Sequence, residues 1–131
     1  MIILDTHVWV WWESRNSRLT GPQREAIENE YRTGSLGISA VSCWEIAMLV
    51  SKGRLNLNMD ALSWFRVALS RPSVELLPLT PEIAVRAYQL PEPFHPDPAD
   101  RLIVATAIEN DCALVTSDTR ILEHPSVATV Y

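Results

Sequence analysis

The stretch Asp97-Pro98-Ala99-Asp100-Arg101-Leu102-Ile103-Val104-Ala105-Thr106-Ala107 predicts a helix that carries an acid in its first turn. Asp97 is a good N-cap, and Pro98 suits the first helical position because its missing N–H needs no partner there. The apolar residues at 99, 102, 103, 106 and 107 recur at helical spacing and leave Asp100 off the buried stripe. We therefore expect Asp100 at the start of this helix, beside the mouth of the fold.

Two further acids are expected directly after buried strands. Asp118 follows the apolar and β-prone run that begins at Ala113, and Asp5 closes the unbroken apolar run 1–4. Such runs are typical of central parallel strands, and open α/β sheets place their ligands at the carboxyl ends of these strands. We expect Asp5 and Asp118 to be neighbours there.

A fourth acid, Glu45, lies in the segment 42–50, a predicted helix whose other positions are nearly all apolar. A charge in such surroundings must be paired, bound to a metal or solvated. The pattern Ser42-x-x-Glu45 also matches a capping box, in which the glutamate returns to the helix N-terminus, so both roles stay open. Four carboxylates brought close together repel one another unless a cation neutralises them, and Mg²⁺ or Mn²⁺ prefers oxygen ligands. The sequence therefore predicts a divalent-metal site.

Each acid also has a purely structural explanation. Asp97 and Asp100 are common helix-start residues, Asp118 suits a turn, and Asp5 suits an N-cap. We assign Asp97 as the cap and Asp100 as a ligand, because one site explains four convergent acids better than four separate roles do. Residues next to the acids are expected to orient a carboxylate or a metal-bound water: Thr6, Asp97, Thr116 and Ser117.

The joint order and spacing of these motifs resemble the PIN-domain ribonucleases, and most closely the VapC-like toxins of bacterial toxin–antitoxin pairs. The motifs are Asp5 after a hydrophobic strand, Trp44-Glu45-Ile46, His95-x-Asp97-Pro98-x-Asp100-Arg101 and Thr116-Ser117-Asp118. The resemblance spans Ile2 to about Val130. It implies a Mg²⁺- or Mn²⁺-dependent endoribonuclease that hydrolyses RNA at Asp5, Glu45, Asp100 and Asp118. It also implies a small antitoxin partner and a homodimer.

The alternation of predicted strands and helices indicates one α/β domain over residues 1–131, with a mostly parallel central sheet and helices on both faces. In the helix expected at 61–70, the predicted buried stripe is 61, 62, 65, 68 and 69, with Trp64 at its edge. The other helices are expected at 6–12, 21–32, 42–50, 81–90 and 119–123, and the strands at 2–5, 36–39, 74–77, 113–117 and 127–130.

The net charge of −5 argues against nucleic-acid binding by bulk electrostatics, although it allows a local basic rim. Candidates for such a rim are Lys52, Arg54 and Arg101; each is more often a solvated charge, and Arg101 is favoured because it adjoins Asp100. Five tryptophans are many for 131 residues. We expect most of them in the core and one or two on a subunit or antitoxin surface.

The remaining metal-binding residue types indicate no zinc site. Cys43 and Cys112 lie in apolar surroundings and are expected to be reduced. His7, His95 and His124 lack zinc-ligand spacing, so we expect local hydrogen bonds for them. Asp5 interrupts the first apolar run too early for a signal peptide, and no run is long enough to cross a bilayer, so a cytoplasmic protein without membrane contact is expected.

Other functions fit the sequence less well. A haloacid-dehalogenase-like phosphatase needs a second aspartate two residues after the first, where this chain has His7. A receiver-like phosphoacceptor domain needs an aspartate near mid-chain, where residues 52–55 are Lys-Gly-Arg-Leu. The serious alternative is an RNA- or protein-binding module that retains the acidic cluster and cuts nothing, and metal-dependent turnover distinguishes the two.

Overall fold

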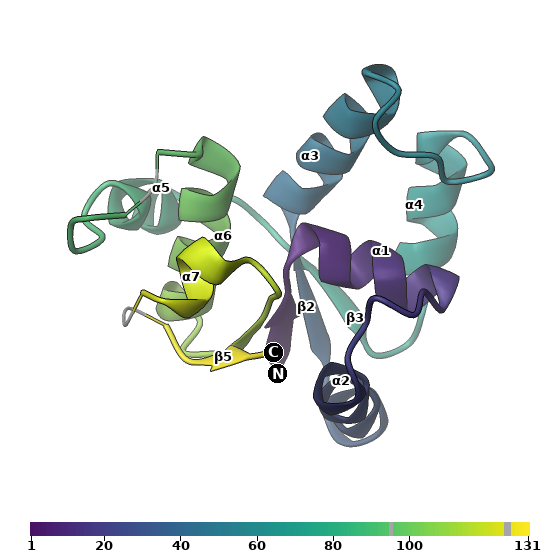
Figure 1. The fold of residues 1–131 in the computed structure, drawn as a ribbon, viewed down its shortest axis with the longest axis horizontal. Helices are drawn as coiled ribbons and strands as arrows, with labels where there is room; N and C mark the ends of the chain where they lie inside the picture. The colour runs from purple at the N-terminus through teal and green to yellow at the C-terminus, as the bar shows by residue number, and fades with distance from the viewer. Residues whose placement is uncertain (95, 125–126) are drawn as a thin grey trace.

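The computed structural model describes residues 1–94, 96–124 and 127–131 and contains a parallel sheet in the order β3-β2-β1-β4-β5 (Figure 1). The central strand β1 pairs with β2 on one side and β4 on the other, with Ile2 opposite Leu36 and Leu4 opposite Val115. The strands are β1 (Ile2–Leu4), β2 (Leu36–Ser39), β3 (Val74–Leu77), β4 (Leu114–Val115) and β5 (Thr129–Val130).

Helices connect successive strands and cover both faces of the sheet (Figure 1). They are α1 (Thr6–Ser14), α2 (Gly21–Thr33), α3 (Ala40–Ser51), α4 (Ala61–Leu69), α5 (Pro81–Ala87), α6 (Pro98–Glu109) and α7 (Thr119–Leu122). Helices α1, α2 and α4 lie on one side of the sheet, whereas α5, α6 and α7 lie on the other. The predicted α/β architecture is therefore confirmed.

Adjacent residues of the central strands pack into two different hydrophobic clusters, one on each face of the sheet. Ile3 and Leu114 pack with α6 and α7, while Leu4 and Val115 pack with α1, α2 and α4. All four side chains are fully buried. Burial on both faces explains why these strands are unbroken apolar runs rather than alternating ones.

Helix α4 buries most of the predicted stripe, because Ala68 is buried and Phe65 and Leu69 pack against the core, but two residues differ from the prediction. Trp64 is buried, whereas Leu62 is 57% exposed. The reason is the partner on α1, because Trp64 meets the fully buried Trp9 edge to face, with ring centroids 4.8 Å apart. The large aromatic contact decides the rotation of the helix, which spacing of apolar residues alone does not show.

Several element ends also differ from the prediction. Helix α5 ends at Ala87 rather than near residue 90, and β4 and β5 hold only the part of their predicted strands that pairs with a neighbour. Of the tryptophans, Trp44 is the exposed one, at 61%. Cys43 and Cys112 are both free and half-buried. No helix within the described ranges is long and apolar enough to cross a membrane.

Candidate active site

A cavity of about 370 Å³ opens where the carboxyl ends of β1 and β4 meet the first turn of α6. The chain continues from β1 to β2 on one side of the sheet and from β4 to β5 on the other side. Open α/β sheets bind ligands at such a switch point. The cavity is lined by Asp5, His7, Val8, Trp11, Glu45, Asp97, Asp100, Ser117, Asp118 and Arg120. All four predicted acids are therefore brought to one cavity.

Asp5 is held rigidly at the end of β1. It is the N-cap of α1, and its Oδ1 accepts a hydrogen bond of 2.9 Å from the Thr6 backbone N–H. Its Oδ2 accepts a 2.6 Å hydrogen bond from the Thr116 hydroxyl. Burial raises the pKa of Asp5 above its ordinary value, and these two hydrogen bonds oppose that rise.

Asp118 lies in the loop after β4, and Thr116 connects it to Asp5. The Asp118 backbone N–H donates to Thr116 Oγ1 at 3.1 Å. The carboxylate of Asp118 caps α7 and also forms an ion pair with Arg120, at 3.0 Å between Oδ2 and the guanidinium. Thr116, one of the residues expected to orient a carboxylate, thus contacts the side chain of one acid and the backbone of another.

Asp100 enters the cavity from the first turn of α6. Asp97 is the N-cap of this helix, and its Oδ1 accepts a hydrogen bond of 3.1 Å from the Asp100 backbone N–H, as predicted. Asp100 lies in the first turn beside the cavity, as predicted, but the residue is only 7% exposed, so the expectation that it lies off the buried face is wrong. Burial, followed by the charges of Asp5, Asp97, Glu45 and Asp118, raises the pKa of Asp100 to about 8. The neighbouring carboxylates thus add to the effect of burial on the Asp100 pKa.

Glu45 reaches the cavity from α3, and the structure rules out the capping-box role for it. The N-cap of α3 is Ser39, whose hydroxyl accepts from the Val41 N–H at 3.1 Å. Ser42 instead receives a hydrogen bond of 3.0 Å from the Thr6 hydroxyl. Burial is the main cause that raises the pKa of the Glu45 carboxyl, with the Asp5 charge adding to it. The helix begins three residues earlier than the Ser-x-x-Glu pattern suggests.

Arg120 is the cavity-lining residue that sequence reasoning missed. Its guanidinium lies 3.0 Å from Asp118 and 3.6 Å from Asp100, and the side chain is 58% exposed. Its position two residues after a site acid, at the start of α7, is the signal that could have identified it. His7 also lines the cavity, from the first turn of α1.

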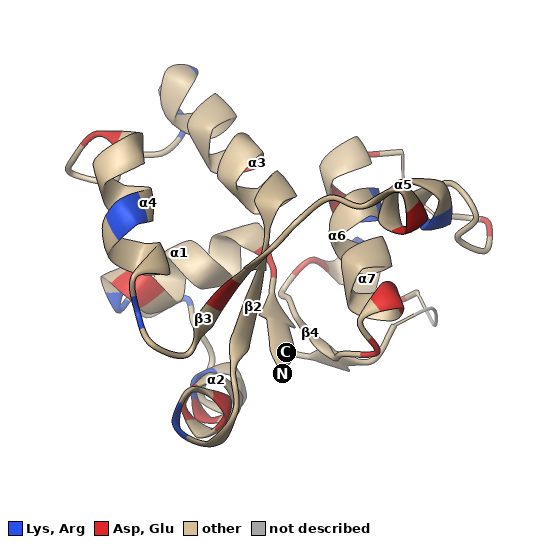
Figure 2. Ribbon diagram, turned by 180° about the vertical axis from the view of Figure 1, so that it is seen from behind, with Lys and Arg blue, Asp and Glu red and all other residues tan. Residues whose placement is uncertain are grey.

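The three basic residues predicted for a rim lie outside this cavity. The prediction that Arg101 belongs to a basic rim is corrected, because its guanidinium donates to the carbonyls of Ala87 and Phe94 at 3.1 and 3.0 Å. It also pairs with Glu92 and so holds the loop before α6. Lys52 and Arg54 are exposed just beyond the end of α3. In Figure 2, basic segments are distributed over several helices.

Two of the histidine predictions can be compared with the structure. His124 makes the expected local hydrogen bond, at 2.7 Å between Nε2 and the Pro91 carbonyl oxygen. His7 faces the cavity, as described above. The prediction for His95, and its place in the motif before Asp97, lie outside the described residues.

The residues of the cavity suit a hard divalent cation in their chemistry. The available donors are carboxylate oxygens, which are the ligands that Mg²⁺ and Mn²⁺ prefer. Within the described ranges, no group of three or more His, Cys, Asp or Glu side chains is already arranged as a metal-binding cluster. The fit therefore rests on the donor set and its charge.

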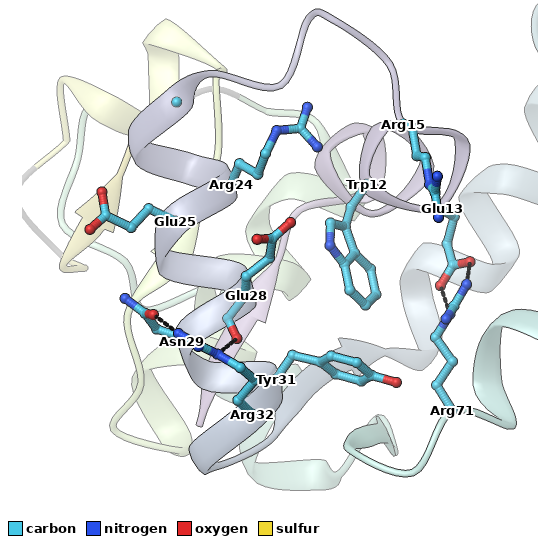
Figure 3. Close-up of a pocket in the computed structure, with 11 residues that line it drawn as sticks. Trp12, Glu13, Arg15, Arg24, Glu25, Glu28, Asn29, Tyr31, Arg32 and Arg71 are labelled. Atoms are coloured by element: carbon cyan, nitrogen blue, oxygen red, sulfur yellow. Dashed lines mark hydrogen bonds and ion pairs between the residues drawn. The ribbon is translucent and has the colours of Figure 1, made fainter.

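A larger groove of about 850 Å³ lies apart from these acids, between the end of α1 and α2 (Figure 3). Trp12 meets Tyr31 edge to face there, and Glu13 is bound to Arg71 through two hydrogen bonds. None of the four predicted acids lines this groove. Its size alone does not make it the candidate active site.

Comparisons with known proteins identify the family of the chain. The family model described as PIN domain matches residues 2–126. The chain is 39% identical over 132 residues to "Ribonuclease VapC22" of Mycobacterium tuberculosis, with 99% of this chain and 98% of that protein covered.

Similar folds occur in solved structures of toxin–antitoxin proteins. A chain of VapBC2 from Rickettsia felis, bound to a promoter DNA fragment, is similar with a TM-score of 0.73 and 20% identity; 98% of this chain and 97% of that chain are covered. A chain of DNA-bound VapBC from Salmonella typhimurium has a TM-score of 0.71 and 18% identity, with the same coverage. At these identities the likeness shows the fold.

Proposed function

Because this chain belongs to the PIN domain family, we propose that it is an endoribonuclease that hydrolyses RNA phosphodiester bonds at the acidic cavity. The observation that carries the proposal is the convergence of Asp5, Glu45, Asp100 and Asp118, from four separate segments, on one cavity at the switch point of the sheet. The 39% identical relative is named a ribonuclease, which supports the same activity.

The proposed cofactor is Mg²⁺ or Mn²⁺, held by the carboxylates of Asp5, Glu45, Asp100 and Asp118. Such an ion, when bound, activates water and stabilises the charge that develops on the phosphate. A bound cation would lower the pKa of Asp100, which burial and then the neighbouring carboxylates raise to about 8.

Other residues of the chain fix the acids and contact the RNA in this proposal. Thr116 orients Asp5 and the Asp118 backbone, while Asp97 fixes the first turn of α6. Arg120 is exposed at the edge of the cavity and can exchange its carboxylate contacts for a phosphate oxygen. Lys52 and Arg54, exposed beyond the end of α3, are proposed to add positive charge that attracts the RNA backbone.

We also propose that the protein is the toxin of a toxin–antitoxin pair and forms a homodimer. The similar solved chains come from complexes titled VapBC and "Toxin-antitoxin complex". Partner surfaces are enriched in exposed aromatic and apolar residues. This chain exposes Trp44 on α3, Leu62 and Val67 on α4, Val85 on α5, and Tyr88 at the C-cap of α5.

The experiment that tests this function is RNA cleavage by the purified protein. We expect cleavage of a mixture of structured RNAs with Mg²⁺ or Mn²⁺, and its loss in EDTA and in Asp100→Asn purified identically. Arg66→Gln on α4, away from the cavity-lining residues, is the matched control and retains activity. Binding of RNA and metal without cleavage would instead favour a non-cleaving binding module.

A further inference from the structure

Gln23 is a fully buried polar residue whose side chain contacts the loop that carries Asp118. It lies in the first turn of α2, which the sequence presents as a largely polar surface helix. Its Nε2 donates to the Thr116 carbonyl oxygen at 3.3 Å and to Ser117 Oγ at 2.8 Å. Helix α2 is therefore tied directly to the edge of the acidic cavity, across 93 positions of sequence.

Two backbone groups fix the orientation of the Gln23 amide. Its Oε1 accepts a hydrogen bond of 3.0 Å from the Thr20 N–H, which can only donate. The Thr116 carbonyl, on the other side, can only accept. A flipped amide would place donor against donor and acceptor against acceptor, so Nε2 must face the loop.

The Ser117 hydroxyl consequently has a defined polarity. Its oxygen accepts from Gln23, and a hydroxyl carries a single proton, which must then be donated elsewhere. Ser117 lines the acidic cavity, and no acceptor for its proton is found among residues 1–94, 96–124 and 127–131. The cavity thus contains a neutral hydrogen-bond donor, the Ser117 hydroxyl, whose direction is set by the hydrogen bond from Gln23.

We propose that Gln23 is a positioning residue that fixes the Ser117 hydroxyl as a donor to a phosphate oxygen of RNA bound in the acidic cavity. The inference rests on the proposed function, because RNA is the ligand that brings the phosphate. The carboxylates of the cavity repel a phosphate group. A neutral hydroxyl among them can donate a hydrogen bond to the phosphate, and it does not displace a carboxylate from a bound cation.

Gln23→Glu separates this role from helix capping. Thr20 and Gln23 form a capping box, in which a glutamate serves as well as a glutamine, so the acceptor for the Thr20 N–H is retained. The two hydrogen bonds that Gln23 Nε2 donates, to the Thr116 carbonyl and to Ser117 Oγ, are lost in this variant. The Ser117 hydroxyl then turns its proton toward the new carboxylate. Thr20→Ala is the reverse control, because it removes the other half of the box, the 3.2 Å bond from the Gln23 N–H.

The measurements are RNA affinity in an Asp100→Asn background, which prevents cleavage, and kcat/KM in the otherwise native chain. Gln23→Glu and Ser117→Ala are each expected to reduce both quantities by roughly tenfold or more. The double variant is expected to be no weaker than Ser117→Ala, because no hydroxyl is left to turn. Thr20→Ala lowers the melting temperature but retains RNA affinity.

Independent, additive losses from Gln23→Glu and Ser117→Ala would overturn the proposal. If Gln23→Glu fails to fold, Gln23→Met, which is apolar and of similar length, replaces it in the same cycle with the same expected non-additivity. The binding cycle decides this inference even for a protein that binds RNA without cleaving it, an outcome that contradicts the proposed nuclease function alone. A wild-type protein that binds no RNA would overturn both.

Discussion

At the residue scale, one hydroxyl group connects two of the four acids. Thr116 Oγ1 donates to Asp5 Oδ2 and accepts from the Asp118 backbone N–H. Thr116 is completely buried, so water cannot take the place of its hydroxyl as a hydrogen-bond partner unless the structure rearranges. The relative placement of Asp5 and Asp118 thus depends on a residue that carries no charge.

Replacing Thr116 tests that dependence. Thr116→Val preserves the shape of the side chain and removes both hydrogen bonds, so we expect a loss of about 1–3 kcal/mol in the free energy of unfolding. RNA cleavage should fall with it, because Asp5 is no longer oriented. Urea denaturation and an RNA cleavage assay measure the two effects, and Thr116→Ser is the control that retains the hydroxyl. Equal behaviour of Val and Ser variants would contradict this role.

Asp100 predicts a pH dependence of stability. Its pKa rises from 3.8 to about 8 on folding, so between these values the folded protein binds a proton that the unfolded chain has released. The metal-free protein should therefore lose stability as the pH rises from about 4 to about 8. Asp100→Asn cannot ionise, and we expect it to melt at a higher temperature than the wild type at about pH 8 but not at about pH 4.

Thermal melts in EDTA at both pH values measure this difference. The comparison uses the wild type and Asp100→Asn in matched buffers, since ionic strength also affects repulsion between carboxylates. A constant difference in melting temperature at the two pH values would show that Asp100 does not titrate in this range.

At the element scale, the first turn of α6 depends on its cap. Asp97 accepts from the Asp100 backbone N–H at 3.1 Å, and Pro98 leaves no N–H unpaired at the first position. Asp97→Ala is expected to cost about 1 kcal/mol of stability and to reduce cleavage, because the turn that carries Asp100 is loosened. Asp97→Asn retains the cap, so urea denaturation should show it close to the wild type.

Arg101, on the same helix, can be tested for its role in holding the loop before α6. Its guanidinium is bound to two loop carbonyls and to Glu92, and it is mostly buried. Arg101→Met should therefore destabilise the fold by about 1–3 kcal/mol, with little change in RNA affinity for the protein that remains folded. Arg120→Met, by contrast, should lower RNA affinity with little change in the free energy of unfolding. A loss of RNA affinity without a loss of stability in Arg101→Met would restore the original prediction.

Local sequence predicted the elements better than it predicted how they pack. Asp97-Pro98, Thr80-Pro81 and the apolar run before Asp5 specify their helices and strand through caps and burial, and the structure confirms these starts. The rotation of α4 toward Trp9, and the true cap of α3, depend on contacts between distant segments. Such contacts leave no periodic pattern in the sequence.

At the scale of the whole molecule, the parallel sheet explains why four acids distant in sequence share one cavity. Strands β1 and β4 are adjacent and parallel, so Asp5 and Asp118 emerge at the same edge. That rule predicts the convergence of Asp5 and Asp118, whereas Glu45 and Asp100 reach the cavity from helices α3 and α6. The contributions of Arg120 and Gln23 could not be predicted, because an exposed arginine and a polar residue in a surface helix have many commoner roles.

The most direct test of this account is Mn²⁺ binding by isothermal titration calorimetry to the metal-free protein and to four variants. We expect the wild type to bind Mn²⁺, with binding weakened strongly in Asp5→Asn, Glu45→Gln, Asp100→Asn and Asp118→Asn alike. Arg66→Gln should bind as the wild type does. Absence of Mn²⁺ binding in the wild type, or unchanged binding in all four variants, would contradict a common cation site.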